Sequence, residues 1–109
     1  MAQHRANSGK NVRYDLRTRE LRRLATEEDY LDGYSSAVVK AYRKMLQSIE
    51  AATDERDLRA LKSHRFEKLK GKRSHQRSVR LKDQYRLILE IDTQGGQRVV
   101  HVIDIEDYH

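Results

Sequence analysis

The residue types that could do chemistry gather in two short segments of the chain. One is the basic run at residues 69–73 (LKGKR), and the other is the sequence EDYH at residues 106–109. Lys70, Arg73 and Arg86 cannot act as bases at neutral pH. They can, however, stabilise the negative charge of a phosphorane-like transition state. These residues therefore point to chemistry on a phosphate group.

The EDYH sequence adds groups that move protons. The imidazole of His109 exchanges protons near pH 7, and the phenol of Tyr108 can donate one. RNA carries its own nucleophile, the 2′-hydroxyl. A metal-free ribonuclease therefore needs only residue types that are present here. The alternative is that this sequence is a frayed strand end, with Tyr108 merely packed against a sheet.

Other kinds of chemistry are disfavoured. The chain has no cysteine, which excludes a disulfide framework, a thiolate nucleophile and a zinc site built on sulfur. Its five histidines, at positions 4, 64, 75, 101 and 109, form neither an i, i+4 pair nor an HxH motif. No glycine-rich phosphate loop precedes a helix. We therefore expect no metal and no cofactor.

Positive charge is concentrated in one block. The 109 residues carry a formal net charge of +6. Residues 59–86 hold 11 basic and 2 acidic side chains (net +9), whereas residues 1–58 are net +1 and residues 87–109 are net −4. Such a block favours a polyanionic partner over a merely solvated face. No apolar run approaches the length of a membrane span, so we expect no membrane association.

Helical signals lie in the first half of the chain. Residues 1–10 are polar without periodicity and predict a flexible extension, leaving residues 11–109 as a single domain. Residues 18–31 predict a first helix. A second helix begins at Ser35 or Ser36, where Val38, Tyr42 and Met45 start a buried stripe that runs to residue 52. Residues 53–61 predict a short helical turn.

After residue 63 apolar and polar residues alternate with a period of two, which indicates strands, and the short segment 12–16 alternates in the same way. Strands are predicted at residues 12–16, 65–69, 76–82, 85–92 and 97–106, with a hairpin loop at 93–96. Alternation places Arg80, Lys82 and Arg86 opposite the apolar face of Leu87 and Leu89. For the last strand it predicts a core face of Val99, Ile103 and Ile105. The predicted class is α+β, with helices on one face of a three- to four-stranded antiparallel sheet.

Three motifs in the second half resemble the HigB-type toxins of the RelE/ParE superfamily. They are RFEKLKG at residues 65–71, SVRLKDQYRL at residues 78–87 and EDYH at residues 106–109. The resemblance covers roughly residues 51–109. It implies a RelE-like microbial RNase fold. It also implies a cytoplasmic toxin of a type II toxin–antitoxin system that cleaves mRNA in the ribosomal A site and inhibits translation.

The resemblance also implies roles for particular residues. Those of the catalytic site are Lys70, Arg86, Asp107, Tyr108 and His109. Glu67 stands where some relatives have a histidine, which makes it a substitute base or a structural carboxylate. The expected contacts with RNA and the ribosome are Arg65, Lys68, Lys72, Arg73, Arg77, Arg80 and Lys82. The implied partners are a HigA-type helix-turn-helix antitoxin, the 70S ribosome and mRNA, with operator DNA bound only through the antitoxin.

Two other functions fit the same fold class. A ParE-like toxin would poison DNA gyrase, but such proteins generally lack the lysine and the terminal Tyr-His pair seen here as Lys70 and Tyr108-His109. A non-catalytic RNA-binding module needs only the basic block. Tyr85 is the one aromatic residue between Lys68 and Arg86, which is poor for recognition by base stacking.

Overall fold

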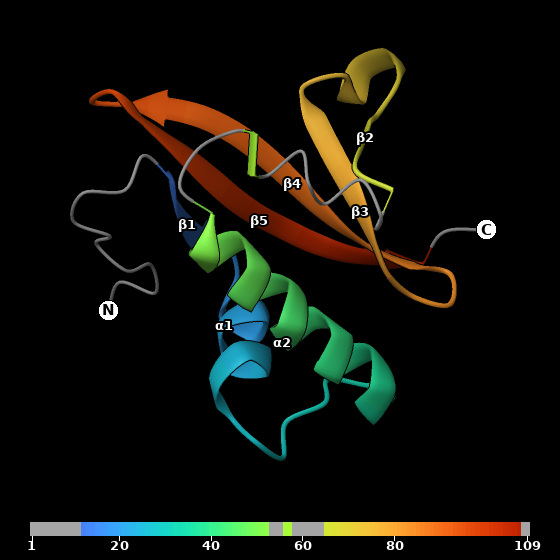
Figure 1. Cartoon of the computed structure of the whole chain (residues 1–109). Helices are drawn as coiled ribbons and strands as arrows, with labels where there is room; N and C mark the ends of the chain where they lie inside the picture. The colour runs from blue at the N-terminus through green and yellow to red at the C-terminus, as the bar shows by residue number, and fades with distance from the viewer. Residues whose placement is uncertain (1–11, 53–55, 58–64, 108–109) are drawn as a thin grey trace.

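The computed structural model describes residues 12–52, 56–57 and 65–107 (Figure 1). The predicted extension at residues 1–10 lies outside this part of the chain, as does most of the predicted turn at 53–61. The elements, in chain order, are β1 (Val12–Leu16), α1 (Arg19–Thr26), α2 (Ser36–Ala51), β2 (Glu67–Lys68), the 3-10 turn η2 (Gly71–Arg73), β3 (Gln76–Lys82), β4 (Tyr85–Gln94) and β5 (Gln97–Asp107).

The strands form one sheet in the order β1-β5-β4-β3-β2, and both helices lie on one side of it (Figure 1). The predicted α+β class is confirmed, although the sheet has five strands instead of three or four. It is also mixed, because β1 pairs in parallel with β5 while the other pairs are antiparallel. The two helices separate β1 from the later strands, so no hairpin forces it to run antiparallel to its neighbour.

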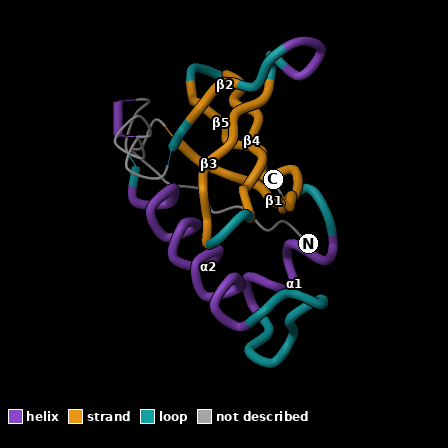
Figure 2. The backbone as a smooth tube through the Cα atoms, turned by 90° about the vertical axis from the view of Figure 1, so that its right-hand side faces the viewer, coloured by secondary structure: helices purple, strands orange, loops and turns teal. Residues whose placement is uncertain are grey.

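Helix α2 is the main support of the sheet. The Ser35 side chain caps its first turn by accepting a hydrogen bond from the Val38 amide at 3.2 Å. Its buried face includes the predicted stripe, and Val39 is buried as well. The fully buried Tyr42 hydroxyl donates to the Leu21 carbonyl at 2.8 Å and so ties α2 to α1. In the rotated view of Figure 2, the helices form one layer beside the strands. No helix in the described ranges is long and apolar enough to cross a bilayer.

Helix α1 is shorter than predicted. The sequence pattern extends to Leu31, but the helix ends at Thr26. The guanidinium of Arg43, on α2, donates to the carbonyls of Leu24 and Glu27, each at 2.8 Å. These hydrogen bonds come from another helix and satisfy backbone carbonyls at the end of α1. The hydrophobic pattern of residues 18–31 alone could not predict them.

The core face of β5 also differs from the prediction. On β4, Ile88 pairs with Asp104 but the next residue, Leu89, pairs with Val102, so the register of the β4–β5 pair shifts by one residue there. Ile103 is thus an extra residue in β5, and the alternation of side chains changes there. The main core cluster takes Val100, Val102 and Ile105, so the prediction is confirmed at Ile105. Val99 is buried as predicted, at 2% exposure, although it pairs with Arg13 and Asp92 and lies outside that cluster. The prediction is wrong at Ile103, which is only half-buried.

The β4–β5 hairpin turns more tightly than predicted. Gln94 pairs with Gln97, so Gly95 and Gly96 alone make the turn. Both have positive φ, at 55° and 82°. This matches a type I′ turn, in which glycine avoids the steric penalty that a side chain would meet. The loop predicted over residues 93–96 therefore shrinks to two residues.

Candidate functional site

The sheet face opposite the helices carries polar side chains in cross-strand rows. One row runs Arg80–Arg86–Glu106, and a second runs Glu67–Ser78–Ile88–Asp104. A third runs Gln76–Glu90–His101–Asp15. We call this surface the polar face. Its polar members are Asp15, Glu67, Gln76, Ser78, Arg80, Arg86, Glu90, His101, Asp104 and Glu106.

Arg86 is a candidate catalytic side chain that two neighbours hold in place. Its Nη1 donates to the Ser78 hydroxyl at 3.2 Å and lies 3.4 Å from the Glu67 carboxylate. The Arg86 side chain is only 13% exposed, whereas that of Glu67 is 54% exposed. The structure therefore brings Glu67 and Arg86 together as an ion pair at the rim of the face. Ser78, which is fully buried, was not among the predicted site residues.

A second arginine faces Arg86 directly. Arg80 on β3 is its cross-strand partner, and like charges in that position repel each other. Beside them lies a pocket of about 430 Å³ lined by Arg65, Arg80, Asp83, Gln84 and Arg86. Its lining includes three arginines and one carboxylate, that of Asp83, so the pocket carries a net positive charge that favours an anion such as a phosphate.

Lys70 lies in the connection between β2 and β3. It is exposed, and its carbonyl accepts a hydrogen bond from the Arg73 amide at 3.3 Å across η2. Gly71, which follows it, has φ 65°, and this left-handed conformation suits glycine. The turn leaves Lys70 and Lys72 exposed at one end of the sheet.

The predicted catalytic residues at the end of the sequence are only partly described. Asp107 is the last residue of β5 and pairs with Tyr85, which packs against the core on the helix side. Its neighbour Glu106 pairs with Arg86 and belongs to the polar face. Tyr108 and His109 lie outside the described residues.

The predicted docking cations do not share one surface. Arg80 and Arg65 line the arginine pocket. Lys68 pairs with Arg77, and Arg77 pairs with the core residue Leu89. Lys68 and Arg77 therefore belong to a cross-strand row on the helix side of the sheet, away from the polar face. The prediction that Lys82 shares a face with Arg80 and Arg86 is wrong. A register shift at Leu81 makes Lys82 pair with Tyr85.

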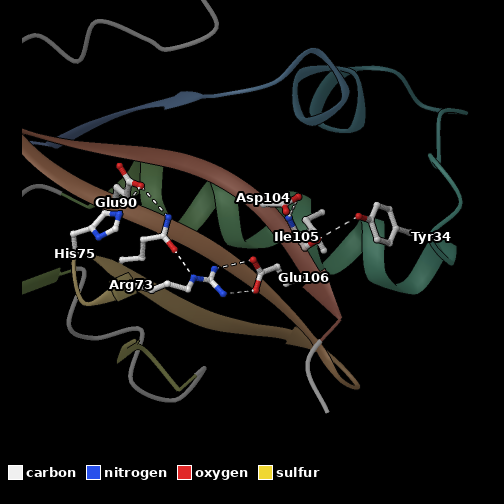
Figure 3. A network of polar contacts seen from close by, with 8 residues as sticks. Tyr34, Arg73, His75, Glu90, Asp104, Ile105 and Glu106 are labelled. Atoms are coloured by element: carbon white, nitrogen blue, oxygen red, sulfur yellow. Dashed lines mark hydrogen bonds and ion pairs between the residues drawn. The ribbon is translucent and has the colours of Figure 1, made fainter. Parts of the chain in front are cut away.

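Arg73, in the turn η2, reaches the polar face and makes three hydrogen bonds with its side chains (Figure 3). Its Nη2 and Nη1 donate to the two carboxylate oxygens of Glu106, at 2.7 and 3.1 Å, and its Nε donates to Gln76 at 2.9 Å. The Gln76 amide in turn donates to Glu90 at 2.9 Å, and His75 lies 3.5 Å from the same carboxylate. The hydrogen bond to Glu106 raises the pKa of Arg73, which stays charged.

Two carboxylates surround the histidine on β5. The Nδ1 of His101 lies 2.9 Å from Asp15 on β1, and its Nε2 lies 3.8 Å from Asp92 on β4. Hydrogen bonds from Gln94 and from the Thr93 amide lower the pKa of Asp92. Within the described chain, no three His, Cys, Asp or Glu side chains are grouped to hold a metal ion. This cluster thus links β1 to the β4–β5 hairpin.

Near its end, β5 extends beyond its partner β1. There the Ile105 amide donates to the Asp104 carboxylate at 2.8 Å, and the Tyr34 hydroxyl donates to the Ile105 carbonyl at 3.5 Å (Figure 3). Partial desolvation raises the pKa of both Asp104 and Tyr34. Tyr34 also packs edge-on against Tyr85, with ring centroids 5.6 Å apart. These contacts fix the strand just before Asp107.

The fold is thus a mixed sheet backed by two helices, and the other face of the sheet carries Arg80 and Arg86 among several acidic side chains. The family model described as the RelE-like toxin of the type II toxin–antitoxin system HigB matches residues 14–109. The chain therefore belongs to the HigB-like toxin family, and its partner is an antitoxin. No curated protein matches it.

Proposed function

We propose that this toxin is a metal-independent endoribonuclease that cleaves mRNA in the A site of the translating ribosome. The observation that carries the proposal is the Arg80–Arg86 pair beside the arginine pocket. Two like charges directly opposite each other repel, and the Glu67 carboxylate, 3.4 Å from Arg86, offsets only part of that repulsion. An RNA phosphate bound between them would remove that repulsion.

The reaction is an intramolecular transfer within RNA. The 2′-hydroxyl attacks the adjacent phosphorus, the bond from phosphorus to the 5′-oxygen breaks, and a 2′,3′-cyclic phosphate and a 5′-hydroxyl result. One protein group accepts the 2′-hydroxyl proton and another donates a proton to the leaving oxygen. Tyr108 and His109 fill these two roles, with Asp107 holding them. Lys70 and Arg86 stabilise the charge that develops on the phosphoryl oxygens.

The contacts of Arg86 support its part in this scheme. A guanidinium that is already bound on one side by Ser78 and Glu67 needs little reorganisation when charge develops at the phosphate. Glu67 then acts as a structural carboxylate for Arg86.

The ribosome aligns the RNA backbone for attack, which the toxin's residues alone do not achieve. General acid–base catalysis is typically worth about 10² to 10⁴-fold, so much of the rate must come from a correctly aligned RNA backbone. The docking cations Arg65, Lys72 and Arg80 hold rRNA and mRNA phosphates while the ribosome shapes the codon. Cleavage of free RNA is correspondingly weak.

The toxin acts in the cytoplasm and is neutralised by a HigA-type helix-turn-helix antitoxin. Operator DNA is bound through that antitoxin. The family assignment to a type II system supports this arrangement, because such toxins are paired with a protein antitoxin.

The test is mRNA cleavage in a translating extract by the wild type, Lys70→Ala and Tyr108→Phe. Both variants should lose cleavage while folding normally. If both retain the wild-type rate, the catalytic assignment is wrong. Gyrase-dependent DNA breaks without mRNA cleavage would indicate a ParE-like toxin instead. Tight RNA binding without cleavage on ribosomes would indicate a non-catalytic module.

A further inference from the structure

Arg73 contributes to the positive block of residues 59–86, but its charge already has a partner. Three of its nitrogens donate hydrogen bonds, two to Glu106 and one to Gln76, at 2.7 to 3.1 Å. The two-point contact with Glu106 is the planar, bidentate arrangement that arginine makes with a carboxylate. An RNA phosphate could bind Arg73 in the same way only by displacing Glu106.

The Arg73–Glu106 pair joins two parts of the chain that matter to the proposed reaction. Arg73 ends the turn that begins at Lys70, since its amide donates to the Lys70 carbonyl at 3.3 Å. Glu106 precedes Asp107 and lies 33 residues away from Arg73 in sequence. One side-chain contact therefore connects the loop of Lys70 to the strand end of Asp107.

The pair is fixed on both sides. On β5, Glu106 pairs with Arg86, while Ile105 is held by Tyr34 and Asp104. On the loop side, Gln76 carries the network from Arg73 to Glu90 on β4 (Figure 3). The two side chains are 46% and 35% exposed, so water screens their charges, but the bidentate contact fixes the orientation of the two groups more firmly than a single hydrogen bond would. The contact is thus better suited to set a geometry than to stabilise the fold.

We propose that Arg73 and Glu106 are positioning residues, which hold the Lys70 loop and the end of β5 in the relative arrangement that RNA cleavage needs. This inference rests on the proposed endoribonuclease function. It differs from the docking role that charge alone assigns to Arg73, because Arg73 acts here through Glu106 and not on RNA.

The effect of Glu106→Gln on RNA binding and on the cleavage rate separates a docking role of Arg73 from a positioning role. Glu106→Gln removes a negative charge from the polar face and frees Arg73. If Arg73 docks on RNA, this change tightens binding and leaves the cleavage step intact. If the pair positions the loop, cleavage at saturating toxin falls by about 10- to 100-fold, since a misplacement near 1 Å can cost about 10²-fold. The toxin concentration at half-maximal rate then changes little.

The assay is single-turnover mRNA cleavage on purified, programmed ribosomes. Arg73→Gln should match Glu106→Gln, and the double variant should be no slower than either single variant, because one shared contact is lost only once. The charge swap Arg73→Glu with Glu106→Arg should recover part of the rate. Glu28→Gln is the matched control, because it removes one negative charge from the exposed connection between α1 and α2 and should cleave like the wild type.

A second readout needs no activity. In the free protein, Glu106→Gln should shift the amide resonances of Lys70 and Gly71, and Glu28→Gln should not. Unchanged loop resonances, or an undiminished maximal rate in Glu106→Gln, would overturn the proposal. If the wild type cleaves no mRNA, the proposed function fails, while the amide shifts still decide whether the loop and the strand end are coupled.

Discussion

Replacing Arg86 by glutamine tests the electrostatic part of the mechanism. The change removes a charged donor whose side chain is 13% exposed, held by Ser78 and Glu67. Loss of one preorganised donor to a transition-state oxyanion typically lowers kcat by about 10² to 10³-fold. We expect a loss in that range.

The same change has a structural cost, which must be kept apart from the catalytic one. The Ser78 hydroxyl is fully buried, and leaving it without a partner costs about 1–3 kcal/mol. The glutamine amide can still donate to that hydroxyl, so we expect the lower end of this range. For a domain of this size, 1 kcal/mol corresponds to about 4–8 °C in Tm. A moderate fall in Tm therefore accompanies a large fall in rate.

The assay pairs single-turnover cleavage on programmed ribosomes with thermal unfolding followed by circular dichroism. Ser78→Ala is the matched variant, since it keeps the charge of Arg86 but removes one of its anchors. It should slow cleavage by only about tenfold, as expected for a loss of orientation. A folded Arg86→Gln protein that cleaves within twofold of the wild type would refute the electrostatic role of Arg86.

Three further predictions concern the framework around the site. Gly71→Ala should lower stability by about 1–2 kcal/mol and slow cleavage, because φ at this position is 65°, whereas Gly71→Asn should be milder in both unfolding and cleavage assays. Tyr42→Phe should lower the unfolding free energy in urea by about 0.5–1.5 kcal/mol with no change in cleavage rate, because it removes the buried hydrogen bond that ties α2 to the Leu21 carbonyl of α1. Asp104 is exposed, but partial desolvation raises the pKa of its carboxyl in the folded state. The folded state therefore loses stability as pH rises from the unfolded-state pKa of this carboxyl through its folded-state pKa. Asp104→Asn should therefore raise Tm at pH 7, and the gain should vanish below about pH 3, where the carboxyl is protonated in both states.

Much of the fold could be predicted from local patterns. The capped, amphipathic α2 and the alternating β3 and β4 agree with prediction because their signals are carried within single segments. The errors arise where another segment intervenes. Arg43 ends α1 early by binding its carbonyls, and the extra residue Ile103 reverses the alternation of β5. The parallel position of β1 depends on contacts with the last strand of the chain.

In the candidate site too, features that depend on one segment were predicted, whereas features that depend on a second segment were not. Alternation placed Arg80 and Arg86 on one face, and the register confirms it. Alternation failed at Lys82, where Leu81 is an extra residue in the strand. The partnership of Arg73 with Glu106 had no signal in the sequence, since the charge count groups Arg73 with the docking cations and the two residues are 33 positions apart.

The most direct test of the central claim is to identify the RNA ends that the wild-type toxin produces on a ribosome stalled at a defined codon. Endonucleolytic cleavage by the 2′-hydroxyl predicts new ends within the A-site codon, with a 2′,3′-cyclic phosphate on the upstream fragment and a 5′-hydroxyl on the downstream one. Arrested translation with intact mRNA would contradict the account, and so would fragments with a 3′-hydroxyl and a 5′-phosphate.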